Sequence, residues 1–188
     1  MNPIFAAAAE IENFCAARGW RFCFIGGVAV QRWGEPRLTL DADLTILTGF
    51  GNESSFTDAL LSCFPGRLTN ARDFALRNRV LLLTAGNDVP LDVSLGAMPF
   101  EERAIERSSA WEIEPGKSLR TCSAEDLVVH KVFAGRDKDW ADVTGIVARQ
   151  AGRLDVDLVH RELDPLLELK GSPESQARFD AILRGSTR

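Results

Sequence analysis

The spacing of hydrophobic positions changes along the chain, from short apolar runs in the first two thirds to a helical period in the last third. Short alternating or continuous apolar runs bounded by glycine, proline or asparagine predict strands. Strands are therefore expected at residues 21–25, 37–47, 74–76, 79–85, 91–95, 111–113 and 119–121. Residues 74–76 and 79–85 have the length of a hairpin, and residues 111–113 and 119–121 flank a Pro115-Gly116 turn.

Apolar residues three or four positions apart predict helices between these strands and after them. Asn2 followed by Pro3 is a typical helix start, and Ser123 followed by Asp126 resembles a capping box. The expected helices cover residues 3–18, 28–33, 56–64, 99–107, 127–134, 158–169 and 174–183, and a further helix carries Trp140, Val143 and Val147 on one side and ends near Gly152. We therefore expect an α+β fold, a mixed β-sheet flanked by helices, in residues 1–122, and a helical C-terminal region, residues 123–188, packed on it.

Composition limits the classes of function. The 188 residues are 45% hydrophobic, as in an ordinary globular protein, and the net charge is −5 with a pI near 5.1. This acidic balance argues against tight nonspecific nucleic-acid binding through total charge. The arginines at positions 67, 72, 77 and 79 leave two interpretations open, a local patch that guides an RNA and a solvated polar face.

Cysteine spacing and the N-terminal residues indicate a cytoplasmic protein. The four cysteines are far apart in sequence and form no C-x-x-C pair, which favours free thiols over zinc ligands or disulfides. The apolar N-terminus has no basic leader and meets Glu10 and Glu12 early, so we expect no signal peptide. No apolar run approaches the length of a membrane span, so no membrane partner is expected.

Two carboxylates share one face of the expected strand at residues 37–47. Because side chains alternate along a strand, Asp41 and Asp43 point to the same side, while Ala42 and Leu44 point to the other. Like charges this close raise each other's pKa unless a positive charge lies between them. A divalent cation held by hard oxygen ligands is the common solution, so Asp41 and Asp43 are candidate ligands of Mg2+ or Mn2+.

Two further features complete this candidate site. Gly26 and Gly27 lie between an expected strand and an expected helix, where a turn can offer backbone N–H groups to a phosphate. Asp92 interrupts an apolar strand, so it faces either solvent or the other two carboxylates. A tight turn and a solvated surface pair remain the simpler explanations of each feature taken alone.

The order Gly-Gly, helix, Asp-x-Asp and a later strand aspartate resembles the nucleotidyltransferase superfamily with a DNA polymerase beta-like core. More narrowly, GGVAVQRWGEPRLTLDADLTI and EDLVVHKVFAGRDKDWADV resemble AbiEii-type nucleotidyltransferases, toxins of bacterial toxin–antitoxin systems. The resemblance implies transfer of a nucleoside monophosphate from an NTP to an acceptor, with Asp41, Asp43 and Asp92 as metal ligands and catalytic residues. It also implies nucleotide binding by Gly26, Gly27, Lys131 and Asp139. One departure is Gly27, where many superfamily members have serine.

We therefore hypothesise a metal-dependent nucleotidyltransferase that releases pyrophosphate and acts on an RNA end, such as that of a tRNA, with a cognate antitoxin as partner. One alternative keeps the reaction and replaces the acceptor by a small molecule or a protein hydroxyl. Another is a nucleotide-binding or antitoxin module without turnover. The presence of all three carboxylates favours the enzyme, because binding alone needs no base beside the acceptor.

Overall fold

A computed structural model describes residues 2–186 of the chain, which divide into two compact units. The first unit contains the described residues up to Val28 together with Leu38–Cys122. The second contains Ala29–Arg37 together with the described residues from Ser123 onwards. The helical unit thus includes a short segment from the first part of the sequence, between Gly27 and the expected Asp-x-Asp strand.

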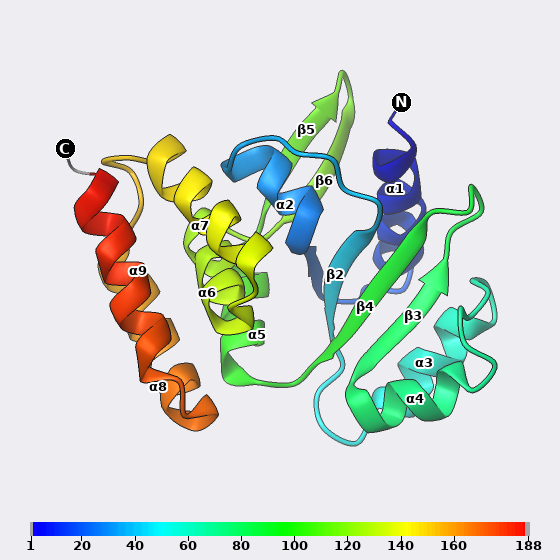
Figure 1. The fold of residues 1–188 in the computed structure, drawn as a ribbon. Coiled ribbons are helices and arrows are strands. Elements are labelled where there is room, and N and C mark those ends of the chain that lie inside the picture. The colour runs from blue at the N-terminus through cyan, green and yellow to red at the C-terminus, as the bar shows by residue number, and fades with distance from the viewer. Residues whose placement is uncertain (1, 187–188) are drawn as a thin grey trace. The chain divides into compact units, whose positions relative to one another are not determined.

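A mixed β-sheet forms the centre of the first unit (Figure 1). Within residues 2–186 its strands follow the order β3-β4-β2-β1-β6-β5. The pairs β2–β4 and β1–β6 are parallel and the others antiparallel. The strand bounds are β1 Phe22–Phe24, β2 Ala42–Leu47, β3 Val80–Thr84, β4 Pro90–Gly96, β5 Ser109–Glu114 and β6 Lys117–Thr121. The α+β architecture expected from the sequence is confirmed.

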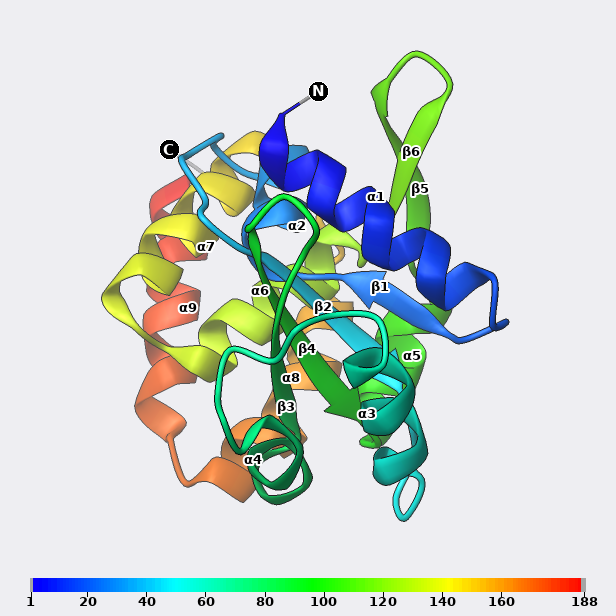
Figure 2. The ribbon, with the colours of Figure 1, turned by 90° about the vertical axis from the view of Figure 1, so that its right-hand side faces the viewer.

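Helices of the first unit pack against this sheet. Their bounds are α1 Pro3–Ala16, α3 Glu53–Leu61, α4 Ala71–Asn78 and α5 Pro99–Glu106, while α2, Gly26–Trp33, continues from this unit into the second. Helix α1 lies across the sheet and contacts β2 and β6 (Figure 2). The side chains of Ile11, Phe24, Leu44, Leu83 and Leu91 are fully buried in the resulting core.

The second unit is built from helices whose ends the sequence marks clearly. Their bounds are α6 Ala124–Ala134, α7 Asp137–Arg149, α8 Val156–Lys170 and α9 Pro173–Ser186. The Ser123 hydroxyl accepts the Asp126 N–H at 3.1 Å, and Gly135 ends α6 at a positive φ of 70°. The expected helix start and stop are therefore both confirmed.

Two expectations about strands are wrong. Residues 74–76 belong to helix α4, because Ala71 and Ala75, four positions apart, face the core while Arg72 and Asp73 are exposed. Strand β2 begins only at Ala42 and not at residue 37. The neighbouring strand β1 ends at Phe24, which pairs with Leu44 of β2. The pairing with β1 therefore does not reach the residues that precede β2, and Leu38 among them is 83% exposed.

No helix within residues 2–186 combines the length and the apolar character that crossing a membrane requires.

Candidate active site

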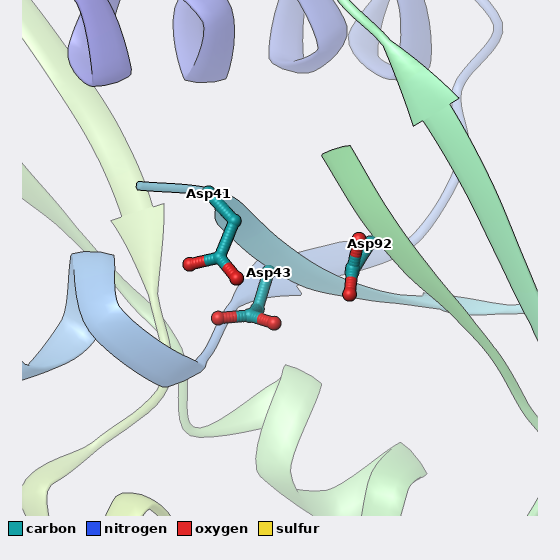
Figure 3. A group of neighbouring side chains, drawn as sticks. All are labelled: Asp41, Asp43 and Asp92. Carbon is teal, nitrogen blue, oxygen red and sulfur yellow. The ribbon is translucent and has the colours of Figure 1, made fainter. Parts of the chain in front are cut away.

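The three aspartates of the candidate metal site converge on one face of the first unit's sheet. Strands β2 and β4 run parallel, and their register places Asp43 directly opposite Asp92. Asp41 precedes β2 by one residue and points to the same side, as Figure 3 shows. Ligand oxygens of the three carboxylates lie within 4.8 Å of one another, and all three residues are half-buried. This set of hard oxygen donors fits Mg2+ or Mn2+.

The glycine pair lets the start of α2 approach the carboxylate of Asp43 closely. Gly26 has a φ of +55°, and a Cβ atom there would lie 2.0 Å from Asp43 Oδ2. The N–H of Gly27 donates to the same oxygen at 3.3 Å. A Cβ atom on Gly27 would lie 2.2 Å from Thr39 Oγ1. Gly26 therefore needs glycine for its backbone conformation and its contact with Asp43, and a side chain at position 27 would displace Thr39, whether or not a phosphate binds there.

Two side chains outside the aspartate set orient it. The Thr39 hydroxyl donates to Asp41 Oδ1 at 3.0 Å, so Thr39 faces the site. The Arg67 guanidinium donates through Nη2 to Asp92 Oδ1 and forms an ion pair with it. Sequence patterns give no sign of this pair, because Arg67 lies in the loop between α3 and α4, 25 residues before Asp92.

Two other arginines of this region also have acidic partners. Arg72 forms an ion pair with Asp58 at 2.7 Å, and Arg79 forms one with Glu53. Arg79 also donates to Thr48 Oγ1 at 3.3 Å and is half-buried. The cluster that the sequence left open as an RNA guide is thus largely neutralised by ion pairs within the first unit.

Lys131 and Asp139 meet in the second unit, within a charged cluster formed by these two residues with Arg37, Arg136 and Asp142. Lys131 Nζ lies 3.1 Å from Asp139 Oδ1 and 2.8 Å from Asp142 Oδ2. Arg37 donates to Asp142 through Nε at 2.7 Å and Nη2 at 2.9 Å. Arg136 Nε donates to Asp139 Oδ2 at 2.6 Å. Lys131, Asp139 and Asp142 are at most 5% exposed.

This pairing determines the ionisation of both aspartates. Burial opposes the charged form of Asp142, but hydrogen bonds from Arg37 and Lys131 outweigh it and hold the pKa of Asp142 below its ordinary value. Burial likewise opposes the charged form of Asp139, and hydrogen bonds from Arg136 and Lys131 keep its pKa low. Asp139 and Asp142 are therefore ionised at neutral pH and paired with basic side chains.

The structure thus places the predicted site residues in two groups. Asp41, Asp43 and Asp92 lie together with Gly26 and Gly27 in the first unit. Lys131 and Asp139 contact each other in the second unit. Sequence analysis missed the pairing of Arg37 with Asp142, which joins residues 105 positions apart.

Comparison with known proteins identifies the family. A family model described as "Nucleotidyl transferase AbiEii toxin, Type IV TA system" matches residues 15–184. The chain belongs to the AbiEii nucleotidyl transferase toxin family. The AbiEii-type resemblance of its motifs is thereby confirmed, and this AbiEii protein is a nucleotidyltransferase.

Two solved structures are similar to this chain but share little sequence with it. An antigenic nucleotidyltransferase-like protein from Paracoccidioides brasiliensis is 15% identical, with 96% of this chain and 93% of that chain covered and a TM-score of 0.54. The crystal structure of ANT(2")-Ia in complex with adenylyl-2"-tobramycin is 16% identical, covers 98% of both chains and has a TM-score of 0.47. No curated protein sequence matches the chain.

Proposed function

We propose that the protein transfers a nucleoside monophosphate from an NTP to a hydroxyl at an RNA end, such as that of a tRNA, and releases pyrophosphate. In this proposal it is the toxin of a cytoplasmic toxin–antitoxin pair and is neutralised by a cognate antitoxin. The observation that carries the proposal is the convergence of Asp41, Asp43 and Asp92 beside the glycine pair. The family assignment supports the same reaction class.

The carboxylates Asp41, Asp43 and Asp92 would hold Mg2+ or Mn2+. When bound, such an ion would supply charge stabilisation for the triphosphate and would lower the pKa of the acceptor hydroxyl. Asp92 lies on β4, which is nearer the sheet edge than β2, and is the candidate base that accepts the proton of the acceptor hydroxyl. Asp43 is held by the Gly27 N–H and is the candidate anchor on the nucleotide side.

The other site residues are proposed to bind the nucleotide on two grounds, the geometry of helix α2 for the glycine pair and the family resemblance for Lys131 and Asp139. Helix α2 begins at Gly26, so N–H groups of its first turn and the positive end of its dipole favour the β- and γ-phosphates. Lys131 and Asp139 are proposed as nucleotide-binding residues through the family resemblance. Lys131 already has two carboxylate partners in the structure, which leaves at most one of its three N–H donors for a phosphate.

A small hydroxylated molecule is the second candidate acceptor. The net charge is −5, and Arg72 and Arg79 are neutralised by ion pairs. The described part of the first unit therefore offers no strong basic patch of the kind that favours RNA binding. The two candidates differ in the product that carries the label when a radioactive NTP is the donor.

The test incubates the purified protein with Mg2+, each α-labelled NTP in turn, and either total RNA or a panel of hydroxylated small molecules. Label on an RNA band supports the proposal, whereas label only on a small molecule establishes the alternative. Asp43→Ala should lose both NTP affinity, measured by calorimetry, and transfer. Asp92→Asn should keep much of the NTP affinity and lose transfer by orders of magnitude. Asp73→Asn, an exposed carboxylate on α4, is the matched control. Full transfer by Asp92→Asn would refute its assignment as the base.

A further inference from the structure

Arg67 contacts Asp92 from a backbone position that is fixed beside the sheet. The Arg67 N–H donates to the Leu82 carbonyl at 2.9 Å, and the Thr84 N–H donates to the Pro65 carbonyl at 2.9 Å. Gly66 forms an isolated bridge with Leu83, and a Cβ atom on Gly66 would lie 2.6 Å from Ala71 Cβ. Pro65, Gly66 and Arg67 thus form a short segment paired with the outer edge of β3.

The strand register aligns Arg67 with the carboxylates. Leu82 of β3 lies opposite Asp92 of β4, and Asp92 lies opposite Asp43 of β2. Arg67 therefore approaches Asp92 from the side away from Asp43. Its guanidinium binds the one aspartate of the three that we assign to the acceptor side.

The ion pair is only partly shielded from water, so it can exchange. The side chains of Arg67 and Asp92 are 31% and 32% exposed, and Arg67 binds Asp92 Oδ1. A divalent ion held by Asp41, Asp43 and Asp92 would share the Asp92 carboxylate with the positively charged guanidinium of Arg67. Two cations that share one carboxylate repel each other, so the ion pair with Arg67 opposes binding of the ion to Asp92.

We propose that Arg67 is a positioning residue that occupies Asp92 in the ion-free enzyme and competes with the divalent ion for that carboxylate. The inference rests on the proposed metal site. Arg67 holds the Asp92 side chain on the face of the sheet that carries Asp41 and Asp43. Its positive charge also reduces the repulsion among the three carboxylates. Binding of the ion releases the guanidinium, and the pairing with β3 keeps it on the acceptor side of Asp92, where it can bind an anionic group of the acceptor.

Mn2+ binding without nucleotide tests the competition directly. Calorimetry should show that Arg67→Gln binds Mn2+ roughly tenfold more tightly than wild type, because a positive charge that shares the carboxylate is lost. Arg67→Lys keeps the charge and should stay within about twofold of wild type. Arg72→Gln removes an equal charge from the same unit, where the arginine is paired with Asp58, and should leave the Kd of Mn2+ unchanged.

The possible outcomes distinguish a failure of the competition between Arg67 and the ion from a failure of the proposed metal site. An unchanged or weaker Mn2+ affinity in Arg67→Gln, with normal binding by wild type, overturns the competition. Equal tightening in Arg67→Gln and Arg72→Gln shows a general charge effect and overturns it as well. No Mn2+ binding by wild type removes the metal site itself, which is a failure of the proposed function. Circular dichroism of each ion-free variant checks that Arg67→Gln and Arg67→Lys are folded.

Discussion

We predict that removing a negative charge from the charged cluster in the second unit costs more unfolding free energy than removing a positive charge. Asp142 is buried and accepts bonds from Arg37 at 2.7 and 2.9 Å, with Lys131 Nζ at 2.8 Å. Asp142→Asn keeps the shape of the side chain but leaves Lys131 and Arg37 with less negative charge. Breaking a buried pair in this way costs about 3–5 kcal/mol of unfolding free energy.

Lys131→Met should cost less, although it removes a residue with two ion pairs. The five side chains of the cluster carry three positive charges, on Arg37, Lys131 and Arg136, and two negative charges, on Asp139 and Asp142. Without Lys131 each aspartate keeps one arginine, and the desolvation of the buried ammonium group is avoided. We expect a loss of about 1–2 kcal/mol for Lys131→Met.

Urea and thermal unfolding followed by circular dichroism measure both variants. For a chain of this length, about 2–4 °C of Tm per kcal/mol predicts that Asp142→Asn lowers Tm by about 6–20 °C. Asp137→Asn, an exposed carboxylate in the first turn of the same helix α7, is the matched control and should leave Tm unchanged. Equal losses in Asp142→Asn and Lys131→Met, or no loss in Asp142→Asn, would refute the charge-balance argument.

Two further predictions concern pH and the glycine pair. Because the pKa values of Asp139 and Asp142 are lowered in the folded state, their stabilisation is complete above the unfolded pKa, about 4, and is lost as pH falls below it. Acid unfolding should therefore be shallower in Asp142→Asn than in wild type, and parallel curves would contradict this cause. Gly27→Ala should weaken Mn2+ binding and lower stability by about 1–3 kcal/mol, because the new methyl group displaces Thr39. Gly185→Ala, where a Cβ atom meets nothing within 4 Å, should be neutral in both measurements.

The candidate metal site could be predicted largely from local patterns. Alternation along residues 37–47 indicates that Asp41 and Asp43 share one side, whereas the apolar neighbours of Asp92 leave solvent and the other two carboxylates as alternatives. The parallel pairing that sets Asp43 opposite Asp92 depends on the crossover between the strands, which no single stretch of sequence encodes. The sequence therefore predicts a shared face for Asp41 and Asp43, and the structure adds Asp92 and the register.

Contacts between distant residues account for what the sequence did not show. The expected strand at residues 37–47 includes Arg37, but Ala29–Arg37 belongs to the helical unit, where Arg37 binds Asp142. No period or cap links positions 105 residues apart. Residues 74–76 failed as a strand for a different reason, because a short apolar run fits helix and strand equally until its neighbours decide.

The glycine pair has a structural cause that is independent of phosphate binding. Gly26 must lack a side chain because Asp43 Oδ2 would lie 2.0 Å from its Cβ, and the Gly27 N–H is already a donor to that oxygen. The Gly-Gly and Asp-x-Asp motifs therefore form one structural unit, in which the start of α2 fixes the Asp43 carboxylate. A serine at position 27 would place its Cβ against Thr39, whose hydroxyl orients Asp41. Glycine at position 27 and threonine at position 39 are consequently a matched choice, and the departure from the superfamily serine follows from the packing of this site.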